Sequence, residues 1–93
     1  MTEVITHWID GGPVLPQGGR RGQVFDPATG VLRAEVDLAD AGVVDRAVVA
    51  ARDAAQVWRA TSLSRRTQVL FAFRELLNAR KEELAAIITA EHG

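Results

Sequence analysis

The chain has 93 residues, with 11 basic and 12 acidic side chains and a formal net charge of −1 at pH 7. This length allows one small domain or one part of a larger domain. The balanced charge argues against a dedicated nucleic-acid-binding protein, which would carry a basic surface. No apolar run reaches the roughly 18 residues that a membrane span needs, and residues 1–10 lack the basic start of a secretory signal. The composition therefore predicts a cytoplasmic protein with neither a nucleic acid nor a membrane as partner.

Cysteine is absent from the sequence. Disulfides, thiolate metal sites and a cysteine nucleophile are therefore excluded for this chain.

Residues 1–38 have the pattern of short β-strands. They contain all three prolines and most of the glycines, and their apolar residues alternate with polar ones. The alternation predicts strands over residues 4–9, 23–25 and 31–38, turns at 10–13 and 26–30, and an exposed loop over 16–22. In the last strand Ala34 and Val36 belong to the apolar face, whereas Asp37 belongs to the polar face. The pattern predicts two linked antiparallel ribbons, each half buried.

Residues 39–93 have helical periodicity. Asp40 is the predicted N-cap of the first helix, whose apolar stripe ends at Trp58. A break follows at residues 61–64, where Ser62 or Ser64 could cap the next helix. We expect a second break near Asn78, which tolerates a left-handed C-cap conformation. The segment is therefore predicted to form two or three amphipathic helices.

The two histidines, His7 and His92, are the first candidates for chemistry. They stand 85 positions apart and have no cysteine or clustered carboxylate beside them, so they do not suggest a metal site. His7 is interpreted as a half-exposed strand residue. His92 could act as an acid or base, but at a helix end it more commonly offsets the negative end of the dipole.

Three charged or glycine-rich motifs are interpreted as surface features. Residues 18–22 (Gly-Gly-Arg-Arg-Gly) lack the spacing of a phosphate loop, and no predicted helix begins directly after them. Arg65 and Arg66 could touch an anion, but a solvated helix face is the commoner reason for such a pair. Glu82 and Glu83 are adjacent, so they point to different sides of a helix and cannot form an acid/base pair.

The aromatic residues are predicted to pack in the core because they lie on or beside apolar stripes; they are Trp8, Trp58, Phe71 and Phe73. No serine, histidine and aspartate have the spacing of a catalytic triad. We therefore assign no catalytic, cofactor-binding or metal-ligating residue within these 93 positions.

The order of segments resembles the N-terminal part of the NAD-dependent aldehyde dehydrogenase superfamily. The matching stretches are residues 6–11 (Thr-His-Trp-Ile-Asp-Gly), 25–30 (Phe-Asp-Pro-Ala-Thr-Gly), 64–71, 74–77, 81–84 and 88–93. The Ile-Thr-Ala-Glu-His-Gly ending and the His-Trp-Ile-Asp-Gly opening are most similar to the CoA-acylating methylmalonate-semialdehyde dehydrogenase branch. Most members of the superfamily have threonine at the position of His92.

The resemblance implies an α/β fold with a Rossmann-like NAD-binding domain, a catalytic domain and an oligomerisation ribbon. It implies a cysteine thiolate that attacks the aldehyde, hydride transfer to NAD, and CoA as the acyl acceptor. Methylmalonate or malonate semialdehyde would give propionyl-CoA or acetyl-CoA. The implied partners are a small aldehyde and further copies of the enzyme in a homo-oligomer, either a dimer or a tetramer.

This chain carries none of the family's nucleotide loop, catalytic cysteine or glutamate motifs, and its apolar stripe still runs at Ile87 and Ile88. We therefore expect residues 1–93 to be an N-terminal fragment that is inactive alone and binds neither NAD nor CoA. In it, residues 1–38 form the ribbons and 39–93 the helices that pack on the NAD-binding domain. Two alternatives are a fragment of a non-acylating NAD(P) aldehyde dehydrogenase and a free-standing interaction module without catalysis.

Overall fold

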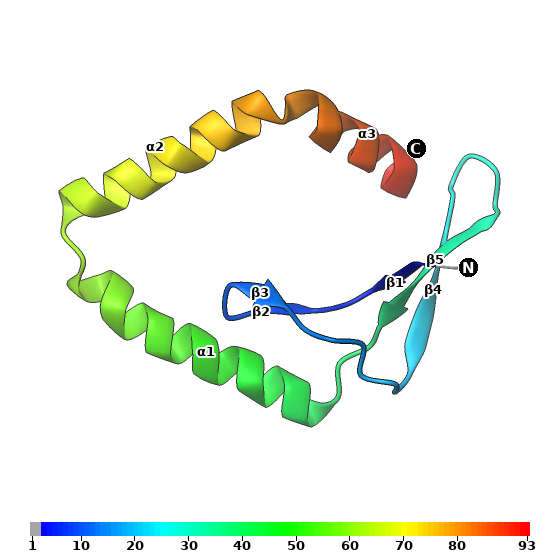
Figure 1. Ribbon diagram of the computed structural model, residues 1–93, viewed down its shortest axis with the longest axis horizontal. Coiled ribbons are helices and arrows are strands. Elements are labelled where there is room, and N and C mark those ends of the chain that lie inside the picture. The colour runs from blue at the N-terminus through cyan, green and yellow to red at the C-terminus, as the bar shows by residue number, and fades with distance from the viewer. Residues whose placement is uncertain (1–2) are drawn as a thin grey trace.

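The computed structural model describes residues 3–93, which form short strands followed by helices (Figure 1). The strands are β1 (Glu3–Ile5), β2 (Trp8–Ile9), β3 (Gly12–Pro13), β4 (Arg21–Phe25) and β5 (Leu32–Asp37), and the helices are α1 (Ala41–Ala60), α2 (Leu63–Ala79) and α3 (Lys81–His92). The predicted order, ribbons and then helices, is confirmed. None of these helices is both long enough and apolar enough to cross a bilayer.

Both antiparallel ribbons are present, and local turn chemistry accounts for them. Strands β2 and β3 pair across Asp10 and Gly11, whose φ angles of 54° and 77° are both positive. Asp-Gly is favoured in such two-residue hairpin turns because both residues tolerate the left-handed region. Between β4 and β5, the Asp26 carboxylate accepts a hydrogen bond of 2.8 Å from the backbone N–H of Ala28. This side-chain bond fixes the turn before β5 begins.

The prediction of one strand over residues 4–9 is wrong. β1 pairs in parallel with β5, and the sheet order is β1-β5-β4, whereas β2 belongs to the separate ribbon with β3. The backbone leaves the first sheet at Thr6 and His7 because the segments on either side of them have different partners.

The predicted loop over residues 16–22 ends earlier than expected. Arg21 and Gly22 already belong to β4, opposite Asp37 and Val36 of β5. A Cβ atom at position 22 would lie 3.3 Å from Cγ1 of Val36, so glycine permits the close approach of the two strands.

The helix starts follow the predicted caps. The Asp40 carboxylate accepts a 2.8 Å hydrogen bond from the N–H of Val43, and the Ser62 hydroxyl accepts one of 3.1 Å from Arg65. Each cap satisfies a backbone donor that the first turn leaves free. Ser62, rather than Ser64, is therefore the cap of α2.

The predicted break near Asn78 is confirmed, but it lies at Arg80 and does not use the predicted left-handed cap. Helix α2 continues to Ala79, and Arg80 ends it with φ −113° and ψ 22°, outside the left-handed region. Nε of Arg80 donates to Glu83 at 3.0 Å across the junction. Glu82 and Glu83 lie in the first turn of α3, where the helix dipole favours acidic side chains.

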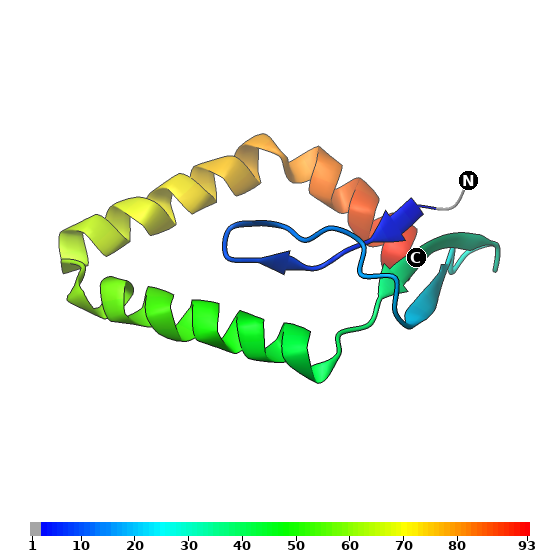
Figure 2. The same cartoon turned by 60° about the horizontal axis from the view of Figure 1, so that its bottom comes forward.

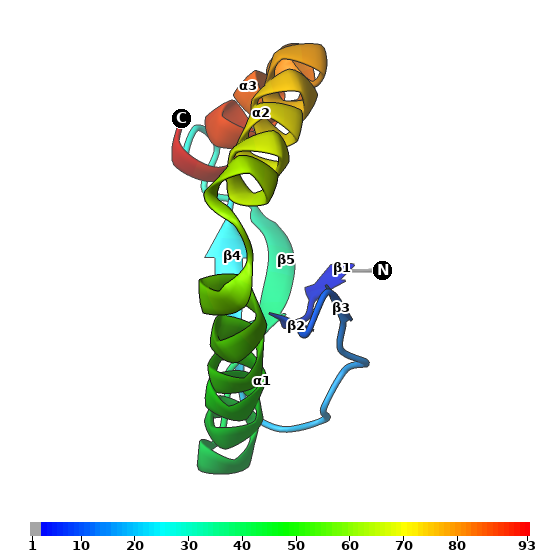
Figure 3. The same ribbon diagram turned by 90° about the vertical axis from the view of Figure 1, so that its left-hand side faces the viewer.

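The helices form an open arc around the β2–β3 ribbon, and the end of α3 returns to the β4–β5 ribbon (Figures 1 and 2). Nη1 of Arg33 and Oε1 of Glu91 join these two elements at 2.6 Å. Seen from its edge the molecule is thin (Figure 3), with extents of 47 × 35 × 17 Å. Its radius of gyration is 17.0 Å, whereas a compact domain of this length has about 12 Å. Within residues 3–93 the apolar core consists of Ala34 and Val43.

Candidate functional site

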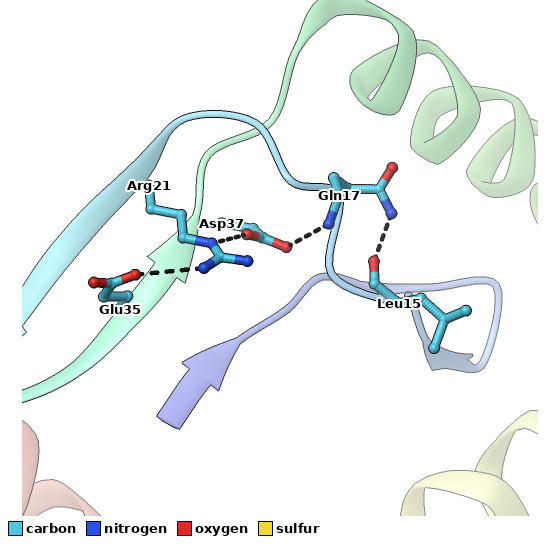
Figure 4. A network of polar contacts seen from close by, with 5 residues as sticks. All are labelled: Leu15, Gln17, Arg21, Glu35 and Asp37. Carbon is cyan, nitrogen blue, oxygen red and sulfur yellow. Dashed lines mark hydrogen bonds and ion pairs between the residues drawn. The ribbon is translucent and has the colours of Figure 1, made fainter. Parts of the chain in front are cut away.

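A cluster of hydrogen bonds and ion pairs surrounds Asp37 at the end of β5 (Figure 4). Its carboxylate side chain is 2% exposed and accepts hydrogen bonds from Nε of Arg21 at 3.1 Å and from the backbone N–H of Gln17 at 3.2 Å. Nη1 of Arg21 also lies 3.5 Å from Glu35. The cluster ties the connection before β4 to the sheet. Since its charged groups bind one another, it acts as a structural clamp.

The backbone N–H of Gln17, and then the guanidinium of Arg21, hold the pKa of Asp37 below its ordinary value of 3.8, although burial acts in the opposite direction. A carboxylate with a lowered pKa stabilises the fold above its unfolded pKa, and this contribution is lost as the pH falls through the folded value. The clamp should therefore weaken in acid.

We expect the wild-type chain to lose stability relative to Asp37→Asn as the pH falls below the ordinary aspartate pKa of 3.8. At neutral pH the wild type should be the more stable, because the variant weakens the pairing with Arg21. Urea unfolding over a pH series measures the difference. Asp53→Asn, at an exposed position of α1, is the control and should follow the wild type. Parallel pH profiles for the wild type and Asp37→Asn would contradict the assigned role of the clamp.

The two histidines lie in separate parts of the fold. His7 is half-buried between β1 and β2, and its Nε2 atom is buried without a hydrogen-bond partner. His92 is exposed in the last turn of α3. Among residues 3–93 no group of histidine, aspartate and glutamate side chains is arranged to hold a metal ion.

The remaining candidates do not form a common site. Residues 18–22 lead into β4 and not into a helix. Arg65 is exposed in the first turn of α2, and its guanidinium lies 3.4 Å from Gln68. Arg66 is half-buried, with an Nε atom that finds no partner. Glu83 is paired with Arg80.

The prediction that the aromatic residues pack in a core is wrong for this chain. Trp8, Trp58, Phe71 and Phe73 are 71%, 42%, 54% and 58% exposed. The amphipathic stripes are present, but the arc leaves them without a packing partner among residues 3–93. Trp58, Phe71 and Phe73 belong, with the exposed valines, leucines and isoleucines of α1–α3, to a large apolar surface on the helices. Such surfaces commonly mark interaction sites.

Three hollows flank the β2–β3 ribbon where it meets α1, and the largest of them, of about 450 Å³, is lined by Ile9, Asp10 and the exposed side of α1 from Asp45 to Asp53. Another, of about 300 Å³, is lined by Trp8, Asp10 and alanines of α1. The third, of about 410 Å³, lies beside His7 and Val43. The hollow beside His7 and Val43 is lined mainly by apolar side chains, so it can accept apolar groups but offers no arrangement of reacting groups.

Sequence reasoning missed the Asp37 clamp. The signal available was a pair of opposite charges, Arg21 in the predicted loop just before the ribbon and Asp37 at the end of its second strand, which the structure pairs. The two residues can be recognised as a pair only when the register of β4 against β5 is known. The glycine-rich loop before β4 hides that register in the sequence.

Comparison with known proteins identifies the family. The family model described as "Aldehyde dehydrogenase family" matches residues 14–93. The chain belongs to the aldehyde dehydrogenase family. It is 37% identical over 87 residues to a malonate-semialdehyde dehydrogenase of Pseudomonas aeruginosa, a match that covers 94% of this chain and 18% of that protein. A malonate-semialdehyde dehydrogenase of Listeria monocytogenes is 37% identical over 89 residues, covering 96% and 18%.

Solved members of the family have the same arrangement of elements. A putative methylmalonate-semialdehyde dehydrogenase from Sinorhizobium meliloti, crystallised in complex with NAD, is 39% identical with a TM-score of 0.93. The methylmalonate-semialdehyde dehydrogenase of Oceanimonas doudoroffii is 40% identical with a TM-score of 0.91. Each match covers 100% of this chain and 19% of the other. The predicted aldehyde dehydrogenase-like fold is thus confirmed, and the chain spans about a fifth of the length of its relatives.

Proposed function

We propose that residues 1–93 correspond to the N-terminal part of a CoA-acylating methylmalonate-semialdehyde dehydrogenase, and that their role in that enzyme is structural. The observation that carries the proposal is the superposition of the whole chain on a fifth of the Sinorhizobium meliloti structure, with a TM-score of 0.93. Residues 3–93 form an open arc in which only Ala34 and Val43 make an apolar core. The same arrangement occurs as one part of a much longer folded protein.

In the full enzyme, residues 1–38 would supply the β-ribbons and residues 39–93 the helices that pack on the NAD-binding domain. The exposed apolar stripes support this role, because burial of such side chains is a major source of folding free energy. The full enzyme would be a cytoplasmic homo-oligomer, either a dimer or a tetramer.

The described residues do not fit NAD. A dinucleotide pyrophosphate is favoured at a helix N-terminus that offers free backbone N–H groups. The N-termini of α1 and α2 are instead occupied by the side chains of Asp40 and Ser62, and the first turn of α3 carries the acidic Glu82 and Glu83. The glycine-rich residues 18–22 run into strand β4 and not into a helix. NAD and CoA would therefore bind outside these residues.

The reaction of the full enzyme would oxidise malonate or methylmalonate semialdehyde, pass a hydride to NAD, transfer the acyl group to CoA and release carbon dioxide. The products would be acetyl-CoA or propionyl-CoA. The nucleophile would be a cysteine thiolate, and this chain contains no cysteine. The 93 residues would thus support the reacting groups from outside the active site.

A chimera tests the proposal. This chain would replace the aligned stretch of the Pseudomonas aeruginosa enzyme, to which it is 37% identical. We expect NADH production from malonate semialdehyde, NAD and CoA by the chimera, and none by the 93-residue chain alone. A chimera that has the same oligomeric mass as the Pseudomonas enzyme but no activity would contradict the proposed role, as would turnover by the chain alone.

The alternative is a fragment of an aldehyde dehydrogenase that uses water and not CoA as the acyl acceptor. A gene product that extends this chain to full length would distinguish the two. NADH production that requires CoA supports the acylating enzyme, and production independent of CoA supports the hydrolytic one.

A further inference from the structure

An ion pair between residues 58 positions apart ties the far end of the helical arc to the strands. Nη1 of Arg33, in β5, donates a hydrogen bond of 2.6 Å to Oε1 of Glu91, in the last turn of α3. The two side chains are 33% and 42% exposed, and within residues 3–93 neither forms another ion pair. The end of α3 therefore has a single charged link to the sheet in the described part of the chain.

Arg33 lies at an irregularity of the sheet. Val24 of β4 pairs with Ala34, and Phe25 pairs with Leu32, so β5 has one more residue than β4 at this point and Arg33 has no partner on β4. Such a β-bulge bends its strand and turns the extra side chain away from the regular direction. The side chain that the bulge presents is the one that reaches Glu91.

A second contact brings the same two parts of the chain together. Gly93 caps α3 with a φ of 89°, and its N–H donates a 2.9 Å hydrogen bond to the carbonyl of Thr89. Glycine is favoured at such a cap because it adopts positive φ without strain. A Cβ atom at position 93 would lie 3.6 Å from Cγ of Pro27, so the cap packs against the turn between β4 and β5.

The rest of α2 and α3 is only weakly attached to the strands. Neither helix contains a buried residue, and the extensive contacts between elements are the strand pairs and the contact of α1 with β2. Segments with few buried contacts open at the lowest cost in free energy. An exposed ion pair is itself weak, and dissolved salt screens it. The closure of the arc is therefore sensitive to the state of one ion pair.

We propose that Arg33 and Glu91 form an ionic latch that closes the arc. When the two side chains are paired, the end of α3 is held against the β4–β5 turn. When the pair is broken, α2 and α3 move away from the strands about the connection between α1 and α2. High ionic strength favours the open form. The latch is a property of the 93-residue chain and does not depend on the dehydrogenase activity proposed above.

A distance measurement across the latch tests the proposal. Because the sequence contains no cysteine, Ala28→Cys in the turn and Ala86→Cys on α3 can carry two spin labels for double electron–electron resonance. We expect one narrow distance distribution with the native pair at low salt. Arg33→Glu and Glu91→Arg each place like charges opposite each other, so the ratio of open to closed chains should rise about fivefold. The double variant Arg33→Glu/Glu91→Arg should restore the narrow distribution, since opposite charges again face each other.

Arg52→Glu, at an exposed position of α1, makes the same charge change away from the latch and should leave the distance unchanged. With the native pair, 1 M sodium chloride should move the distribution toward that of the single variants, because the Debye length falls to about 3 Å. Circular dichroism checks that each variant retains its helix content. Single variants that keep the narrow distance, a double variant that stays as open as they are, or a native pair that does not respond to salt would overturn the proposal.

Discussion

Replacement of Ala34 by leucine should lower the free energy of unfolding by about 1–3 kcal/mol, the usual cost of adding methylene groups to a packed position. Ala34 is the one apolar residue among 3–93 with no exposed surface. It lies in the central strand β5, opposite Glu3 of β1 and Val24 of β4. A larger side chain there must displace its neighbours, so it disturbs both pairings of the sheet. Urea unfolding followed by circular dichroism measures the change.

Ala86→Leu is the matched control. Position 86 is exposed on α3, and leucine is nearly as good a helix former as alanine, so the expected change is within about 0.5 kcal/mol. Equal effects of Ala34→Leu and Ala86→Leu would show that the sheet around Ala34 has room for the larger side chain. Both measurements need the same protein concentration, because association of the chain would add to its apparent stability.

The parts of the fold that depend on neighbours in sequence could be predicted from the sequence. Asp40 and Ser62 cap helices because a short polar side chain reaches a backbone N–H three residues ahead. The turn at Asp10 and Gly11 follows from the same kind of local preference. In each case the two bonded groups lie within a few residues of each other, so the pattern contains all the information needed.

Contacts between distant residues could not be predicted in this way. The parallel pairing of β1 with β5 joins Glu3 to Ala34, and no property of a three-residue strand specifies that partner. The Asp37 clamp depends on the same long-range order, because Gln17 and Arg21 reach it from another part of the chain. The break between α2 and α3 lies at Arg80, which makes no side-chain capping hydrogen bond, so no local cap signal marks that position in the sequence.

The sequence predicts the helical periodicity of the apolar stripes correctly. It does not predict whether those stripes are buried. A stripe predicts that a helix face prefers to be covered and contains no information about what covers it. Phe71 and Phe73 are exposed because residues 3–93 form an arc and not a layered core. In a compact domain this sequence pattern predicts a core, but here it marks surfaces that are open to a partner. These open surfaces connect the fold with its proposed structural role.

Replacement of Val43 by alanine should lower the free energy of unfolding by about 2 kcal/mol, since it removes two buried methyl-sized groups and leaves a small cavity. Val43 is 5% exposed in the first turn of α1. It lines the same hollow as His7 and Ile9, which belong to the strand segment at the β2–β3 ribbon. Its side chain therefore anchors the start of α1 against the strands. Loss of this contact should free the helix start while the Asp40 cap remains.

Val49→Ala makes the same chemical change at a position of α1 that is 52% exposed. Alanine is the better helix former, so this variant should be neutral or slightly stabilised, by at most about 0.5 kcal/mol. Urea midpoints of the two variants at one protein concentration give the comparison. If Val43→Ala were no more destabilising than Val49→Ala, α1 would not be held by its first turn, and the arc would have to be maintained by its other end or by a partner.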